Sequence, residues 1–476
     1  MKRKVKLFKA AGVLFLLIFA LFYSHVEVGM SGIESGRFAT IQAVAEQGAF
    51  HIEKCNFRTV DKTVRNNHVY SDKLPFLSFV LGQLYKPFHR FCGVNFVDNY
   101  HLSIYLINLL TGALINILFF LWFFDLLRAL KKGRLEIKFL LALGAVAGSW
   151  IISYSTMLNN HTPAALAVLG IFISAVRYKQ KNSWKAALLA GFSAGIAGLL
   201  ELPCGLFFGI AALGTVFFSA PARKKFSHTA LTAAAGAVCL AFGLGLNQYA
   251  YGTWLPLYMG SHGVKGTFSF GVQSDPVYYW FHALIGDRGL FLYTPFLLLG
   301  VWGAVKNWKF QTVPERALLL GTGGFMLFYL LGTNEFGGQS YGFRYFIPVI
   351  PVLWYQGAKV LLELKMTKTV TAVTAALLLW GAAAGLTGAY FPFNVGNEGE
   401  RSPKGHFTRN FSSFGGNLLC WSYEYMPHSS LTRHLINRYG LPDSLLYMYW
   451  SYFHQKKVDM LARMKRDFPD LYPGKK

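Results

Sequence analysis

The chain has 476 residues, of which 53% are hydrophobic and 14% are charged, and it carries a formal net charge of +24. That composition is too apolar for a soluble protein of this length. Apolar runs of about 17–25 residues, the length that a helix needs to cross a bilayer, recur along the chain and predict an all-α polytopic membrane protein.

The apolar runs predict about eleven transmembrane helices. The first follows the basic flank Lys2–Lys9 and is expected to stay as an anchor, because no small-x-small cleavage site of a signal peptide follows it. The expected spans are 10–26, 100–127, 138–157, 163–177, 185–201, 204–219, 229–247, 290–305, 317–333, 345–362 and 369–391. Gly191 and Gly195 have the small-xxx-small spacing that favours close helix contact.

The positive charge encodes the orientation of the chain. With the N-terminus in the cytoplasm, the inner segments are rich in Lys and Arg and contain few acids, which is the positive-inside pattern. These basic segments are Lys2–Lys9, Arg128–Lys138, Arg177–Lys185, Arg223–Lys225, Lys306–Arg316 and Lys359–Lys368. A nucleic-acid partner is therefore not implied, and we expect a multi-pass protein with its N-terminus cytoplasmic and its C-terminus outside.

The longest polar interval before the C-terminal tail is the first outer loop, residues 27–99. Apolar positions within 36–49 and 74–91 predict two helices that lie at the membrane surface, the second interrupted at Lys86-Pro87. The chain thus divides into a transmembrane domain, 1–391, and an outer cap segment, 392–476, which carries an apolar stripe at helical spacing. The stripe consists of Leu441, Leu445, Met448, Tyr449, Tyr452 and Phe453.

The five cysteines are scattered, so no zinc or redox pair is indicated. Cys204 and Cys239 fall within spans, whereas Cys55, Cys92 and Cys420 fall outside, where a disulfide is left open. No P-loop, GxGxxG, HExxH or GxSxG motif occurs, which disfavours soluble nucleotide chemistry. We predict no metal site, although the sequence leaves a divalent cation open.

Ionisable residues gather instead on the outer face, where such groups invite a functional interpretation. The polar residues that the predicted topology places on this face are Glu34, Arg37, Asp61, Tyr70, Asp72, Lys73, Asn160, His161, Glu201, Asp287, Arg288, Glu335, Tyr341 and Arg344. For most single members, ordinary polarity of an outer loop explains the residue equally well. The aromatic residues Trp254, Tyr258, Tyr278, Tyr279 and Trp280 fit either a sugar platform or an interfacial belt.

The segments GIESGRFATIQAVAEQGAF and YSDKLPFLSF resemble the first outer loop of the GT-C membrane glycosyltransferases. The protein O-mannosyltransferases and the lipid A aminoarabinose transferases carry an acidic pair followed by Arg-Tyr-Ala, and later Lys-Pro-Pro. Here Glu34 stands at the first acidic position, Ser35 replaces the second, Arg37-Phe38-Ala39 matches Arg-Tyr-Ala, and Lys73-Leu74-Pro75 matches Lys-Pro-Pro. The segments LNNHTPAAL, GDRGLFLYTPF and GGQSYGFRYFIPVIP are also similar to bacterial members, which implies a bacterial cytoplasmic membrane.

The resemblance implies an inverting transfer of a sugar, a hexose or a pentose, from a polyprenyl-phosphate or polyprenyl-diphosphate carrier to an acceptor hydroxyl. The acceptor could be a lipid, a glycan or a protein. Such an acceptor needs a base, for which Glu34 is the candidate and Asp61 and Asp72 are rivals. Cations must stabilise the leaving phosphate, and Arg37, Lys73 and Arg344 are the candidates. Acceptor or sugar contacts are assigned to Tyr70, Asp72, His161, Glu201 and Tyr341.

Each role has a structural alternative. Glu34 could cap its helix, Arg37 could pair with an acid, and Lys73 and Arg344 could anchor helices at the interface. Two other functions stay open: a transporter or flippase of lipid-linked saccharides, and a catalytically silent relative that binds the lipid carrier. The few charges inside the spans favour an interface enzyme with a cavity open sideways to lipid and outward to the acceptor.

Overall fold

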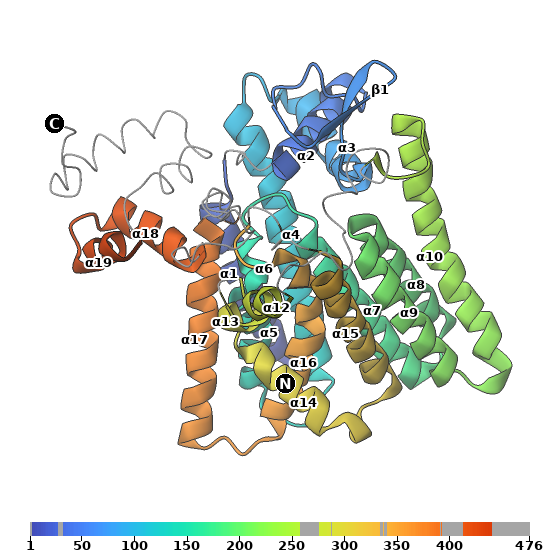
Figure 1. The fold of residues 1–476 in the computed structure, drawn as a ribbon. Coiled ribbons are helices and arrows are strands. Elements are labelled where there is room, and N and C mark those ends of the chain that lie inside the picture. The colour runs from blue at the N-terminus through green and yellow to red at the C-terminus, as the bar shows by residue number, and fades with distance from the viewer. Residues whose placement is uncertain are drawn as a thin grey trace.

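The computed structural model describes residues 2–26, 32–257, 276–286, 288–333, 337, 340–390, 392 and 413–439. Long helices form a bundle, and the elements of the first outer loop gather at one end of it (Figure 1). The fold is all-α and polytopic, as predicted, with a single two-stranded sheet in the described parts of the chain.

Every predicted span coincides with a helix or with two consecutive helices. The helices of the bundle are α1 (Lys2–Tyr23), α4 (Tyr100–Arg128), α5 (Leu135–Ala147), α6 (Trp150–Ser153), α7 (His161–Lys181), α8 (Trp184–Leu200), α9 (Leu202–Ser219), α10 (Ala222–Tyr251), α13 (Leu290–Tyr293), α14 (Phe296–Lys306), α15 (Val313–Gly332), η4 (Arg344–Val349), α16 (Ile350–Glu363) and α17 (Lys368–Tyr390). Seven helices among the described residues are long and apolar enough to cross a membrane, and α8 and α14 are shorter apolar helices. The chain is therefore an integral membrane protein, while the count of about eleven spans stays a prediction.

Two of the predicted spans are broken rather than continuous. The span expected over 138–157 ends as α5 at Ala147, and α6 restarts at Trp150 with Ser149 as its N-cap, whose side chain accepts from the backbone N–H of Ile151. The span over 290–305 is divided by Thr294-Pro295 into α13 and α14. Hydropathy alone does not detect such breaks, because the residues around them remain apolar.

The predicted close contact at Gly191 and Gly195 is confirmed. A side chain at Gly191 would collide with the carbonyl oxygen of Thr232, and a Cβ at Gly195 would lie 2.5 Å from the Cβ of Cys239. Helices α8 and α10 therefore pack backbone against backbone, as small residues at a membrane helix interface allow.

The first outer loop contains α2 (Gly32–Gln42), a π-helical turn η1 (Ala43–Gln47), the hairpin of β1 (Lys62–Arg65) and β2 (His68–Ser71), and α3 (Pro75–Cys92). Sequence analysis did not predict the hairpin. Its turn residues Asn66 and Asn67 have φ of 50° and 62°, the left-handed values that a tight two-residue hairpin turn requires and that Asn tolerates. The hairpin leads directly to Asp72 and Lys73.

Two expectations for this loop are corrected. We expected the first helix to lie on the membrane surface, but α2 is buried from Glu34 through Gln42, because α3 and the hairpin cover it on the outside. We also expected an interruption at Lys86-Pro87, but α3 runs through Pro87 to Cys92. Its buried residues, Leu77, Leu81 and Tyr85 among them, recur at helical spacing and face the bundle.

The basic segments meet at the opposite end of the bundle from the first loop (Figure 1). Lys9 pairs with Asp125 at 2.6 Å, and Lys359 pairs with Glu315 at 2.7 Å. These two pairs join α1 to the end of α4 and α16 to the start of α15, and both lie on the same side of the molecule. This distribution fits the predicted orientation, which itself stays a prediction.

Beyond α17, the described part of the cap segment consists of α18 (Ser413–Tyr425) and α19 (Ser430–Tyr439). Helix α18 packs beside α17, and the amide of Asn417 donates to the carbonyl oxygen of Thr387 at 3.1 Å. The apolar stripe at Leu441–Phe453 and the side chain of Cys420 lie outside the described residues. Cys55 and Cys92 are both free.

Candidate functional site

Helix α2 presents two different faces to its surroundings. Gly32 and Gly36 are four residues apart and face the hairpin, where a Cβ at Gly36 would lie 2.7 Å from the Oγ of Ser71. Glu34 and Arg37 are three residues apart and share another face of the helix. The side chain of Glu34 is fully buried, and Arg37 is 5% exposed. A carboxylate and a guanidinium group are thus held inside the protein, one helical turn apart.

Arg37 links the first loop to the bundle. Its Nη2 donates to the side-chain oxygen of Asn160 at 3.2 Å, just before α7 begins. Its buried Nε has no hydrogen-bond partner among the described residues. Burial and the nearby charge of Arg344 lower the pKa of Arg37 to about 10, against an opposing effect of Asp72. Two cations that repel each other inside a protein form a ready site for an anion.

Lys73 lies at the end of the hairpin between two carboxylates. Its Nζ is 3.1 Å from Asp61 and 3.0 Å from Asp72, and all three side chains are about a quarter exposed. Burial and the neighbouring Asp61 raise the pKa of Asp72, although Lys73 opposes the shift. The candidate phosphate ligand Lys73 and the two rival bases therefore form one ion-pair group.

His161, Glu201 and Tyr329 form a buried network. The Nδ1 of His161 lies 2.9 Å from one carboxylate oxygen of Glu201, and the hydroxyl of Tyr329 donates to the other at 2.5 Å. Asn160, which accepts a hydrogen bond from Arg37, also donates one from its side-chain amide to the carbonyl oxygen of Leu200 at 3.0 Å. Polar contacts therefore run from α2 through the start of α7 to the α8–α9 junction and α15.

We expect Tyr329→Phe to lower the free energy of unfolding by about 1.5–3 kcal/mol, because a hydrogen bond to a buried carboxylate is lost. The measurement is the unfolding midpoint of the detergent-solubilised protein in denaturant. Tyr249→Phe is the matched control, since Tyr249 is 80% exposed on α10 and should leave the midpoint unchanged. Equal midpoints for both variants would show that the Tyr329 hydroxyl contributes nothing.

Arg344 opens η4 and is 4% exposed. Its guanidinium carbon lies 5.7 Å from the ring centroid of Tyr345, whose ring stacks on Tyr329 at 4.6 Å and meets His161 edge-on at 5.5 Å. Arg288 is equally buried and donates to the carbonyl oxygen of Ser340. The segment 340–345 thus brings Arg344 beside the His161 network.

Two predicted contact residues are engaged in packing. Tyr70 on β2 is 8% exposed and meets the ring of Tyr251 at 5.2 Å. Tyr341 is fully buried, and its hydroxyl donates to the carbonyl oxygen of Ala384 on α17 at 2.7 Å. The ring contact and the hydrogen bond give each residue a structural role. Their roles in acceptor or sugar binding stay predictions.

The charges of the site favour an anionic ligand. Apart from Lys138 and Glu315 at the basic end, the buried charged residues in the described part of the chain are Glu34, Arg37, Glu201, Arg288 and Arg344. Three guanidinium groups and two carboxylates make up this set, so its formal charge is positive.

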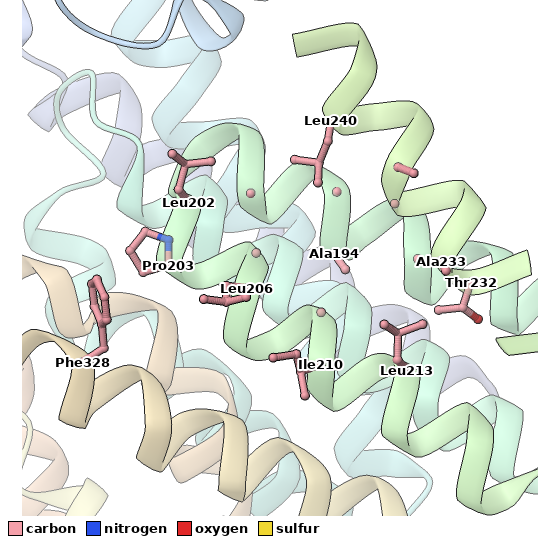
Figure 2. Close-up of a pocket in the computed structure, with 17 residues that line it drawn as sticks. Ala194, Leu202, Pro203, Leu206, Ile210, Leu213, Thr232, Ala233, Leu240 and Phe328 are labelled. Carbon is pink, nitrogen blue, oxygen red and sulfur yellow. The ribbon is translucent and has the colours of Figure 1, made fainter. Parts of the chain in front are cut away.

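An apolar groove of about 730 Å³ begins next to Glu201 and runs along α8, α9 and α10 (Figure 2). Leu202, Pro203 and Phe328 lie at one end of it, and Leu213 and Thr232 lie toward the other. Leu206 and Ile210 on its wall are 55% and 60% exposed, so the groove opens to the side of the bundle. An apolar groove that opens to the side of the bundle can hold a hydrocarbon chain.

Sequence reasoning missed several residues of this region. Tyr329 and Tyr345 are aromatic residues within apolar segments, where the sequence gives no sign of a polar partner. Also missed was the group of His51, Glu53 and His68, whose potential ligand atoms all lie within 4.8 Å of one another. Asp287, Glu335 and Tyr258 lie outside the described residues.

No protein-family model and no curated protein matches the chain. Among solved structures, it is similar to ArnT from Cupriavidus metallidurans bound to undecaprenyl phosphate. The TM-score is 0.56 at 15% identity, and the match covers 98% of this chain and 80% of that one. The chain therefore shares the all-α polytopic membrane fold of ArnT, in agreement with the GT-C fold that the first-loop motifs implied.

Proposed function

We propose that the chain is an inverting glycosyltransferase of the membrane. It would move a sugar from a polyprenyl-phosphate or polyprenyl-diphosphate carrier to an acceptor hydroxyl on the outer face. The observation that carries the proposal is the mutual influence of the buried Arg37 and Arg344, where the first loop meets the bundle, with the buried carboxylate of Glu34 three residues before Arg37 on α2. The undecaprenyl phosphate bound to ArnT supports a lipid-phosphate donor for a chain of the same fold.

In this proposal, Glu34 removes the proton from the acceptor hydroxyl as its oxygen attacks the anomeric carbon of the sugar. The bond between that carbon and the phosphate oxygen breaks, and the carrier leaves as the polyprenyl phosphate or polyprenyl diphosphate anion. Arg37, Arg344 and Lys73 stabilise the charge that develops on the phosphate. No acid is needed to protonate the leaving group, so one carboxylate suffices, in contrast to the carboxylate pair of glycosidases.

The remaining residues receive supporting roles. His161 and Glu201, joined at 2.9 Å, would bind the sugar or acceptor next to the phosphate. The apolar groove that starts at Leu202 would hold the prenyl chain within the membrane. The N-terminus would be cytoplasmic and the C-terminus outside. The first loop, and with it the transfer, would then lie on the outer face of a bacterial cytoplasmic membrane.

The test is a comparison of glycolipids and glycoconjugates from cells with and without the gene. We expect cells without it to lose one glycosyl modification and to accumulate the corresponding lipid-linked sugar. Purified protein in vesicles should then transfer that sugar and release the polyprenyl phosphate. Movement of the intact lipid-linked sugar across the vesicle membrane, without release of polyprenyl phosphate, would instead identify a flippase.

A further inference from the structure

The first loop contains a partly exposed group of potential metal ligands beside its hairpin. His51 and Glu53 lie in the segment after η1, and His68 begins strand β2. The Nδ1 atoms of His51 and His68 lie 2.8 and 3.1 Å from the two different carboxylate oxygens of Glu53. The two imidazole rings stack with their centroids 4.6 Å apart. All three ligand-type side chains therefore converge on one point.

The carboxylate of Glu53 is held in place by the hairpin. The backbone N–H of Val69 donates to its Oε1 at 2.6 Å, and the N–H of Ile52 donates to the carbonyl oxygen of Val69 at 2.8 Å. Burial alone would raise the pKa of Glu53, but hydrogen bonds from backbone N–H groups and from both histidines lower it to about 2. Metal ligands are commonly oriented by such outer hydrogen bonds.

We propose that His51, Glu53 and His68 bind a divalent transition-metal ion, Zn²⁺ being the best fit. Zinc takes imidazole nitrogen and carboxylate oxygen at about 2.0–2.2 Å in tetrahedral geometry, which places neighbouring ligand atoms about 3.3 Å apart. Each histidine Nδ1 lies 2.8 or 3.1 Å from a different oxygen of Glu53, and one ligand atom from each of the three residues lies within 4.8 Å of the others. Small rotations of these partly exposed side chains would admit the ion and leave a fourth position for water.

The ion would fasten the segment 51–53 to strand β2. That strand continues through Tyr70 and Ser71 to Asp72 and Lys73, so the metal would fix the chain just ahead of the ion-pair group of Lys73. The site is structural in this inference and takes no part in the transfer. Its test requires neither donor nor acceptor and is independent of the proposed function.

The experiment is zinc titration calorimetry of the full chain, purified in detergent without a histidine tag and stripped with chelator. We expect one zinc per chain for the wild type and at least about 100-fold weaker binding for the double variant His51→Ala/His68→Ala, since losing a ligand costs more than losing an outer hydrogen bond. His101→Ala, which removes a histidine at the start of α4, is the matched control and should bind like the wild type.

The unfolding temperature provides a second readout. Zinc should raise it for the wild type and His101→Ala and leave it unchanged for the double variant, because only the folded protein offers the three ligands together. If the double variant does not fold, Glu53→Gln takes its place in both measurements. Wild-type protein that binds zinc no more tightly than these variants would overturn the site.

Discussion

Glu34→Gln is expected to reduce sugar transfer by about 10²–10⁴-fold, the usual contribution of a general base. Glutamine has nearly the shape of glutamate and can occupy the same fully buried position at the start of α2. It cannot accept the proton of the acceptor hydroxyl, so turnover should fall while affinity for the lipid donor stays unchanged. Single-turnover transfer and donor binding, measured on the same purified protein, separate the two quantities.

Glu46→Gln is the control for this result. Glu46 belongs to the same loop, and its carboxylate accepts from the backbone N–H of Phe96 and from Gln42, which is a structural role. The control variant should retain transfer. Full transfer by Glu34→Gln would show that Glu34 is not the base and would favour its alternative role as a helix cap.

Asp61 and Asp72 are the rival bases, and the same assay decides between them. The pKa of Asp72 is raised by burial and by Asp61, which would make it a stronger base than an ordinary aspartate. Both carboxylates, however, are ion-paired to Lys73. We therefore expect Asp61→Asn and Asp72→Asn to change donor affinity more than turnover. Each variant removes a negative charge next to Lys73, the proposed phosphate ligand. A loss of turnover confined to Asp72→Asn would transfer the role of base to Asp72.

The sequence predicted the bundle well because its information is local. Length and hydropathy locate a membrane helix without knowledge of its neighbours, and each predicted span coincides with a helix or a pair. The breaks at Ser149 and at Thr294-Pro295 depend on capping and on local turns. The residues around them are apolar, so hydropathy averaged over a window of residues does not detect them. The hairpin was missed although Asn66-Asn67 between two short β-prone stretches is a local signal of a tight turn.

The site could be predicted only in part because its contacts join distant residues. The sequence placed His161 and Glu201 on one face of the membrane, and the structure brings them to 2.9 Å although 40 positions separate them. Tyr329 lies 128 positions beyond Glu201 within an apolar run, so its hydrogen bond could not be foreseen. The burial of α2 was missed for the same reason, since the elements that cover it come later in the chain.

The second large effect is expected for the arginines. Arg37→Gln and Arg344→Gln should each weaken binding of undecaprenyl phosphate by about 10- to 150-fold. This range corresponds to losing one hydrogen bond to a charged group, roughly 1.5–3 kcal/mol, at 1.4 kcal/mol per tenfold change. Fluorescence-quench or calorimetric titration in detergent gives the affinity. Arg58→Gln is the matched control, because Arg58 is an exposed arginine of the same loop.

A comparison of undecaprenyl phosphate with the neutral alcohol undecaprenol separates phosphate binding from a structural role. If the arginines contact the phosphate, their loss weakens the phosphate form and leaves the alcohol unchanged, because the prenyl chain binds in the apolar groove. If they only support the fold around Asn160 and Tyr345, both ligands lose affinity by the same factor. Since Arg37 and Arg344 repel each other, replacing one of them also removes the repulsion that acts on the other. The double variant should therefore lose less phosphate affinity than the product of the two single losses.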